Sequence, residues 1–254
     1  MLLAIDTSTS YAGLALADGE RLVAELTWQA GMRHSTDLFA RLGQLFETYG
    51  VAPDALDGIA VATGPGSFNG IRVALATAKS LAFALAKPLY GVPTLDTIAW
   101  GASFVDCRIW ALLEAGRGQL YTAEYAAPPV DAAEWAPLAG YAILTAPEVA
   151  ARVTQPVVFC GEWRPETRMA LEAALGQRAR FAATLQSGRA GWLAQLARGR
   201  AARDDSDDPA RLEPLYLRRA AITHSAKVAL PETADDDTAP LEARYGGEGA
   251  ARAL

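Results

Sequence analysis

The residues that most suggest chemistry form a glycine-rich loop between a predicted strand and a predicted helix. The loop reads Gly64-Pro65-Gly66-Ser67-Phe68-Asn69-Gly70. Such a loop can bind phosphate, because its exposed N–H groups and the dipole of the following helix attract anions. The spacing fits neither a dinucleotide fingerprint, which needs glycine in place of Asn69, nor a P-loop, which needs lysine in place of Ile71. We therefore predict a tight structural turn.

Other residue types that could carry catalysis are few and scattered. The two histidines, His34 and His224, lie far apart in the sequence, and no His-x-x-x-His pair offers metal ligands. Cys160 lies in an apolar run without a visible histidine partner, so we expect burial rather than nucleophilic work. Ser67 lacks the flanking glycines of a nucleophile elbow. The sequence predicts no metal centre and no catalytic nucleophile.

The elements around the glycine loop are a strand, a helix and a second strand. Residues 57–63 form a short apolar run, 68–86 a long run without proline, and 88–92 a second short run. This order predicts two parallel strands joined by a crossover helix. Ala74, Ala78 and Ala82 recur every four residues of that helix, so one side has little side-chain volume. Such a helix is buried in its own domain or shared with a partner subunit.

The chain before the loop predicts a hairpin and a helix. Strands are expected at 2–5, 11–17 and 21–28, with Asp18-Gly19 as the hairpin turn. Residues 34–49 form a helix capped by Ser35, and its apolar stripe is wide for a surface helix. Core packing or a contact with a partner helix would each explain this stripe.

The chain after residue 92 repeats this organisation in a shorter form. We expect a helix at 95–104, a hairpin of 109–113 and 120–125, a capping box at Thr145, a buried strand at 156–160, and helices at 166–175 and 189–197. The repeated order of hairpin and crossover favours two duplicated α/β domains. Residues 198–208 are interpreted as a solvated charged linker, with RNA contact as the alternative. Residues 221–254 are interpreted as a polar, disordered tail.

Composition limits the class of protein. The chain has 254 residues, of which 51% are hydrophobic and 20% charged, enough for a sizeable core. A net charge of −6 and a pI near 5.0 disfavour a surface that grips nucleic acid alone. No apolar run is long enough for a membrane span, and the start of the chain does not fit a secretory signal. The two cysteines fit a reducing cytoplasm, which is the expected location.

Three motifs of the sequence belong together. They are the loop Gly64–Arg72 with the following Ala76-Thr77-Ala78-Lys79, the first strand Leu3–Ser8, and the closing motif Pro214–Arg218. These motifs resemble the bacterial TsaB (YeaZ) family. The resemblance covers residues 1–218 in matching order. It implies two duplicated actin-like domains of the ribonuclease H-like (ASKHA) type, the second one smaller. The expected division is 1–104 for the first domain, with its dimerisation helices, 105–220 for the second, and 221–254 for the tail.

The resemblance also implies a non-catalytic role. TsaB-like proteins pair with the catalytic TsaD subunit and, with the ATPase TsaE, serve synthesis of threonylcarbamoyladenosine beside the anticodon of tRNAs that read codons starting with A. tRNA is expected to be met mainly through the complex, and a homodimer is expected without the partner. The implied interface lies on the helices 34–49 and 68–86. Its candidate residues are Leu38, Leu42, Leu45, Phe68, Ile71, Arg72, Leu75, Ala78 and Ala82.

Rival functions remain open at this point. Asp6-Thr7-Ser8 lies where actin-like kinases place a phosphate-contacting hairpin, but Ser8 replaces their usual glycine. Glu114 lies where those kinases often keep an aspartate near phosphate, and Gly116 interrupts the pattern usual in TsaB. Asn69 replaces the threonine usual in the family. An ATP-binding phosphotransferase is therefore the first rival, a peptidase the second, and a homodimeric scaffold the third. We expect no bound cofactor and leave ATP binding open.

Overall fold

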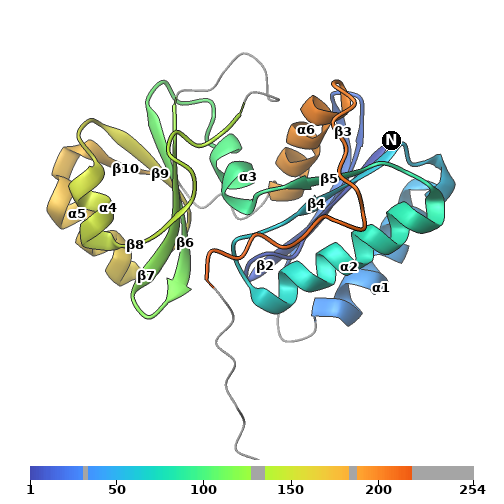
Figure 1. Ribbon diagram of the computed structural model, residues 1–254, viewed down its shortest axis with the longest axis horizontal. Coiled ribbons are helices and arrows are strands. Elements are labelled where there is room, and N and C mark those ends of the chain that lie inside the picture. Colours follow the sequence, from blue (N-terminus) through green and yellow to red (C-terminus); the bar gives the residue numbers. More distant parts are fainter. Residues whose placement is uncertain (31–33, 127–134, 183–187, 219–254) are drawn as a thin grey trace, which may run out of the picture. The chain divides into compact units, whose positions relative to one another are not determined.

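The computed structural model describes residues 1–30, 34–126, 135–182 and 188–218, with the backbone alone at 34–36 (Figure 1). Residues 1–219 form one compact unit. The predicted tail at 221–254, with His224, lies outside the described residues, as do the side chains of His34 and Ser35.

The described strands form two five-stranded sheets. The first has the order β3-β2-β1-β4-β5 and consists of β1 (Leu2–Asp6), β2 (Tyr11–Asp18), β3 (Arg21–Gln29), β4 (Gly58–Ala62) and β5 (Leu89–Val92). The second has the order β10-β9-β6-β7-β8 and consists of β6 (Arg108–Gly116), β7 (Gln119–Tyr125), β8 (Ala142–Thr145), β9 (Val157–Glu162) and β10 (Ala179–Phe181). In each sheet the central strand, β1 or β6, pairs antiparallel with the next strand and parallel with β4 or β9.

Six α-helices in the described part of the chain cover these sheets. They are α1 (His34–Tyr49), α2 (Phe68–Leu85), α3 (Thr94–Trp100), α4 (Ala146–Arg152), α5 (Pro165–Leu175) and α6 (Arg189–Ala201). Helices α1 and α2 cover one face of the first sheet, and α4 and α5 cover the outer face of the second (Figure 1). No helix of the described residues is long and apolar enough to cross a membrane.

The alternation of side chains along β1 explains this layering. Leu3 and Ile5 belong to the core under α1 and α2, whereas Leu2 and Ala4 belong to the core on the opposite face. Successive side chains of a strand point to opposite faces, so a strand that is apolar throughout must be covered on both. The first sheet therefore lies between two layers of helix.

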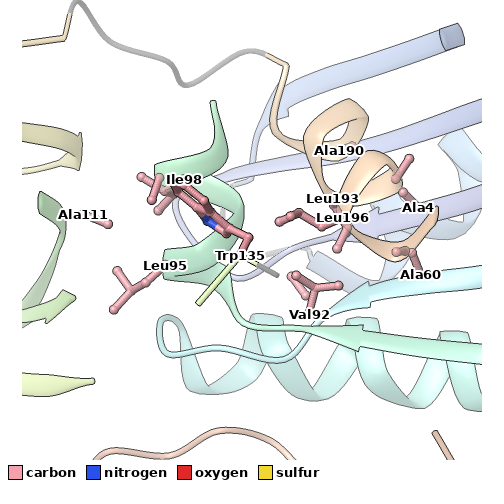
Figure 2. Close-up of a cluster of buried hydrophobic side chains, with 14 of the residues drawn as sticks. Ala4, Ala60, Val92, Leu95, Ile98, Ala111, Trp135, Ala190, Leu193 and Leu196 are labelled. Atoms are coloured by element: carbon pink, nitrogen blue, oxygen red, sulfur yellow. The ribbon is translucent and has the colours of Figure 1, made fainter. Parts of the chain in front are cut away.

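The core on that opposite face joins the two sheets. Helices α3 and α6 contribute Leu95, Ile98, Leu193 and Leu196, and the second sheet contributes Ala111 (Figure 2). Because this core is continuous from one sheet to the other, burial of apolar surface holds them together. Both sheets therefore belong to one folding unit.

The predicted elements compare closely with those observed. The helix at 34–49 has the predicted bounds, and the capping box at Thr145 is confirmed by reciprocal hydrogen bonds with Glu148. The short strands β8 and β10 were not predicted. Helix α6 follows the second sheet in sequence, yet it packs against the first sheet.

The segment 198–208 was predicted to be a solvated charged linker, and the structure corrects this prediction in part, since α6 extends to Ala201 and two charged side chains of the segment are engaged. Arg200 donates to the carboxylate of Asp207 at 2.7 Å and to the carbonyl of Gly91 at 2.8 Å. Asp207 in turn accepts from the Gly91 amide at 2.7 Å. Arg200 and Asp207 therefore fasten this segment along β5, whereas residues 202–206 between them are exposed.

Candidate functional site

The first candidate site is the helix pair α1 and α2. Seven of the nine predicted interface side chains point into the core beneath the helices and are at most 6% exposed; these are Leu38, Leu42, Leu45, Ile71, Leu75, Ala78 and Ala82. In the chain alone these side chains are held in its own core, and their assignment to a partner interface stays a prediction. A wide apolar stripe was needed to fill the space between helix and sheet.

The other two predicted interface residues, Phe68 and Arg72, lie on the surface. The ring of Phe68 is 41% exposed and stacks on Tyr216 at 5.2 Å between ring centroids. The guanidinium of Arg72 lies over the Phe68 ring, 5.2 Å from its centroid. The closing motif of the sequence is thereby fixed beside the start of α2.

The helix pair also has an exposed side whose residues were not among the predicted interface residues. We call it the outer helix face and define it by Phe39, Gly43, Ala76, Ser80 and Phe83, all of which are exposed. Phe39 is 59% and Phe83 87% exposed. Small residues permit close approach of another backbone, and exposed aromatic rings lose water when they are covered. This face has the composition of a helix-packing surface.

The glycine loop positions the start of α2. The amide of Ser67 donates to the carbonyl of Ser8 at 2.7 Å, and the Ser67 side chain caps the helix by accepting from Gly70. A Cβ on Gly66 or Gly70 would lie about 2 Å from the carbonyl oxygen of Ser8 or Thr7. The glycines allow the β1–β2 turn to lie directly on the loop, which agrees with the predicted structural turn.

The second candidate site is a pocket of about 600 Å³ at the carboxyl ends of the parallel strands. Ser8 and Ser67 line it from loops of the first sheet, and Glu114, Glu162 and Trp163 line it from the second sheet. Crevices at the carboxyl ends of strands are where α/β sheets bind ligands. The pocket can therefore hold a small polar molecule.

One carboxylate oxygen of Glu114 is engaged within the chain. Its Oε1 accepts from the Arg164 amide at 2.9 Å and from the Thr167 hydroxyl at 2.8 Å. Both donors lie at the start of α5, so the carboxylate satisfies the first turn of this helix and complements its dipole. Through these two hydrogen bonds Glu114 stabilises the start of α5.

Asp6, at the end of β1, is also engaged within the chain. It is fully buried, and its Oδ2 accepts from Nε of Arg189 at 2.8 Å. Nη1 of the same guanidinium donates to Oε1 of Glu162 at 2.7 Å. The carboxylate that the rival phosphotransferase would need to bind nucleotide is thus paired with an arginine of α6.

Sequence reasoning missed Arg189 and Glu162, although one signal was present. Arg189 opens the apolar helix α6, where the positive end of the helix dipole disfavours a cation. A cation in that position indicates that its side chain pairs with an acidic group elsewhere in the chain. The partner could not be identified, because Asp6 lies 183 residues away in sequence.

The remaining candidate groups do not assemble a catalytic centre in the described part of the chain. Cys160 is fully buried, burial raises the pKa of its thiol, and the predicted burial is confirmed. Cys107 is partly buried and, like Cys160, is a free thiol. Among the described residues, no group of three or more His, Cys, Asp or Glu side chains could hold a metal ion.

The chain is similar to proteins and a protein family of tRNA modification. A family model described as TsaD, tRNA N6-adenosine threonylcarbamoyltransferase, matches residues 28–152. The tRNA threonylcarbamoyladenosine biosynthesis protein TsaB of Bacillus subtilis is 36% identical over 124 residues, which are 49% of this chain and 54% of that protein. The TsaB protein of Escherichia coli is 32% identical over 126 residues, with the same shares. The chain thus spans about half the length of the curated relatives it matches.

A solved structure extends the similarity to most of the described fold. YeaZ from Pseudomonas aeruginosa superimposes with a TM-score of 0.71 at 27% identity, covering 85% of this chain and 99% of that one. This agreement supports the α/β fold with two five-stranded sheets that is described above.

Proposed function

Because the chain belongs to the TsaB (YeaZ) family of the actin-like superfamily, we propose that it serves synthesis of threonylcarbamoyladenosine in tRNA as a non-catalytic subunit. Its partner is a TsaD-like transferase, with a TsaE-like ATPase completing the assembly in the cytoplasm. tRNA is met mainly through the assembled complex.

The outer helix face is the observation that carries this proposal. Two adjacent helices expose Phe39 and Phe83 beside small residues, while their other sides are occupied by the core. A partner that lays its own helices on this face would bury both rings in a helical bundle. Without that partner, a second copy of the chain would cover the same face as a homodimer.

The proposal that the subunit is non-catalytic is supported by contacts near the second candidate site. An ATP-binding phosphotransferase is the alternative, and the pocket at the strand ends favours it. Asp6, which that alternative would need to bind nucleotide, is already paired with Arg189, however. Cys160, the buried thiol, lacks access to solvent. These contacts favour a subunit that supports a catalytic partner over an independent enzyme.

We further propose that the chain consists of two duplicated domains divided near residue 104, the second being the smaller. The identical order and directions of the two sheets support this proposal. Helix α6 departs from the division, since it follows the second sheet and packs on the first.

The test is light scattering after size exclusion, for this chain alone and mixed with the TsaD-like subunit of the same organism. We expect a one-to-one heterodimer that replaces any homodimer. Two chains that elute separately, with and without ATP, would overturn the subunit proposal and direct attention to nucleotide binding.

A charge on the outer helix face tests the location of the interface. We predict that Phe83→Glu weakens heterodimer formation at least tenfold, because a carboxylate would be desolvated where a ring was buried. Phe83 is 87% exposed, so the change leaves the fold intact, as circular dichroism would confirm. Affinity is measured by titration calorimetry.

Met169→Glu is the matched control for this variant. Met169 is also an exposed apolar residue, at 67%, but it lies on α5 over the second sheet. We expect its affinity for the partner to equal that of the unaltered chain. An interface elsewhere would be indicated if Phe83→Glu bound as tightly as this control.

A further inference from the structure

The side chain of Arg189 is enclosed by oxygen atoms. It is 4% exposed, and each nitrogen of its guanidinium donates at least once. Nε donates to Asp6 Oδ2 at 2.8 Å, and Nη2 donates to the carbonyl of Tyr11 at 2.6 Å. Nη1 donates at 2.7 Å both to the Thr9 hydroxyl and to Glu162 Oε1. We call these four acceptors the oxygen cage.

The oxygen cage draws its members from both sheets. Asp6 ends β1, Thr9 lies in the following turn and Tyr11 begins β2, all in the first sheet. Glu162 ends β9 in the second sheet, and its Oε2 accepts from the Ser10 hydroxyl at 2.9 Å. The fully buried Asp6 and the partly exposed Glu162 meet at this guanidinium, and the buried carboxylate in particular requires a cation, because unpaired buried charges are strongly disfavoured.

We propose that the oxygen cage is a cation site which the chain fills with its own side chain. Arg189 acts there as an internal cation that fastens the second sheet to the first at the edge of the pocket. The chemical class that the cage accepts is a small cation with several N–H donors, since all its ligands are oxygen atoms that accept hydrogen bonds. Because Arg189 supplies the positive charge, the contact between the two sheets at the edge of the pocket needs no bound metal ion or nucleotide.

Arginine suits this task better than lysine. A planar guanidinium presents donors in several fixed directions, whereas an ammonium group is a compact point charge. Acceptors on β1, β2 and β9 surround the guanidinium from different sides, so one ammonium group could not reach all of them. The identity of the residue at position 189 thus follows from the geometry of the cage.

The start of α6 is adapted to tolerate this charge. The carboxylate of Glu25, on β3, accepts from the amides of Ala190 at 3.1 Å and Gly191 at 3.3 Å. A carboxylate at this end of the helix complements the dipole that Arg189 opposes. The chain accommodates a cation at an unfavourable helix position, which indicates that the cage requires it there.

The proposal is tested by removing the Arg189 side chain and then adding cations that could take its place. We expect Arg189→Ala to lower the thermal midpoint by at least about 6 °C, the shift of a lost buried network in a chain of this size. Guanidinium chloride at about 20 mM, far below denaturing concentrations, should raise the variant's midpoint relative to equal sodium chloride. It should not raise the midpoint of the unaltered chain. Magnesium chloride at matched ionic strength is the second arm, and rescue by it alone would assign the cage to divalent ions.

A pair of variants keeps the proposal testable if Arg189→Ala does not fold. Asp6→Asn should lower the midpoint of the unaltered chain, because it weakens the pairing with Arg189. In an Arg189→Met background the same change should raise the midpoint, because it removes one of two uncompensated carboxylates. The proposal is overturned if no cation rescues Arg189→Ala, or if Asp6→Asn lowers the midpoint in both backgrounds. These outcomes concern the isolated chain and do not depend on the proposed partner.

Discussion

At the scale of single residues, Asp96 is a buried acid whose pKa departs from its ordinary value. It lies on α3 and is 8% exposed, and its Oδ1 accepts from the hydroxyls of Tyr125 at 2.7 Å and Tyr141 at 2.8 Å. Burial raises the pKa of Asp96 from the ordinary 3.8 to about 6, although the two hydroxyls lower it. The core between the sheets therefore holds a carboxylate that titrates in a mildly acidic range.

The raised pKa of Asp96 makes stability depend on pH in a defined direction. The folded chain binds this proton more tightly than the unfolded chain, so protonation stabilises the fold. The contribution is fully present below about pH 4 and is lost as the pH rises through about 6. Relative to Asp96→Asn, we predict that the unaltered chain gains on the order of 1–3 kcal/mol of unfolding free energy between pH 7.5 and 4.5. Urea denaturation of both proteins measures this difference.

Tyr141→Phe provides the control for that measurement. It removes one donor that stabilises the charged form of Asp96, so the pH-dependent difference should move to higher pH. A difference between the unaltered chain and Asp96→Asn that stays constant from pH 7.5 to 4.5 would show that Asp96 is not buried in this way.

At the scale of elements, the contact between the β1–β2 turn and α2 depends on Gly70. A Cβ at this position would lie 1.9 Å from the carbonyl oxygen of Thr7, and the Thr7 hydroxyl donates to the Gly70 carbonyl at 2.6 Å. We predict that Gly70→Ala destabilises the fold by about 1–3 kcal/mol or more, because backbone must move to remove the overlap. Chemical denaturation followed by circular dichroism measures the loss.

Gly43→Ala is the matched helical control for Gly70→Ala. Nothing lies within 4 Å of a Cβ at Gly43, which is exposed on α1. Alanine should therefore stabilise this helix by roughly 0.5–1 kcal/mol through its better propensity. If Gly70→Ala were also stabilising, the turn would not lie against α2 as described.

The elements that the sequence predicts well are those with local signals. Helix α1 has the predicted bounds because Gly50 ends its regular apolar spacing, and α4 has a capping box at Thr145. The strands β8 and β10, of four and three residues, were missed because pairing with neighbours decides such short segments. Local spacing identifies an element, whereas its pairing partners must come from the fold.

The candidate sites show the same division. The apolar spacing of α1 and α2 correctly indicates that one side of each helix is buried. Spacing alone does not tell whether the chain's own core or a partner protein buries it. The buried Ala78 and the exposed Phe83 lie on the same helix, and only the position of the sheet separates their roles. The cage around Arg189 was beyond prediction, since its members come from distant parts of the chain.

At the scale of the whole molecule, the return of α6 to the first sheet ties the two halves together. Leu193 and Leu196 of α6 pack with Ala4 and Ala60 on the face of the first sheet opposite α1 and α2 (Figure 2). A chain cut at residue 104 would lose this helix. The first sheet would then expose apolar side chains on one whole face.

We therefore predict that the fragment 1–104 does not fold cooperatively by itself, whereas the fragment 1–218 unfolds in one transition. The physical reason is the lost burial, since each large apolar side chain contributes roughly 1.5–3 kcal/mol and the net stability of a domain is only about 5–15 kcal/mol. Thermal melts by circular dichroism and dispersion of amide signals by NMR measure the difference. Mixing fragments 1–104 and 105–218 should restore dispersion, because the second fragment supplies α6. A dispersed spectrum and a sharp melt for 1–104 alone would instead mean that α6 is dispensable, and that the first five strands with α1–α3 are a complete domain.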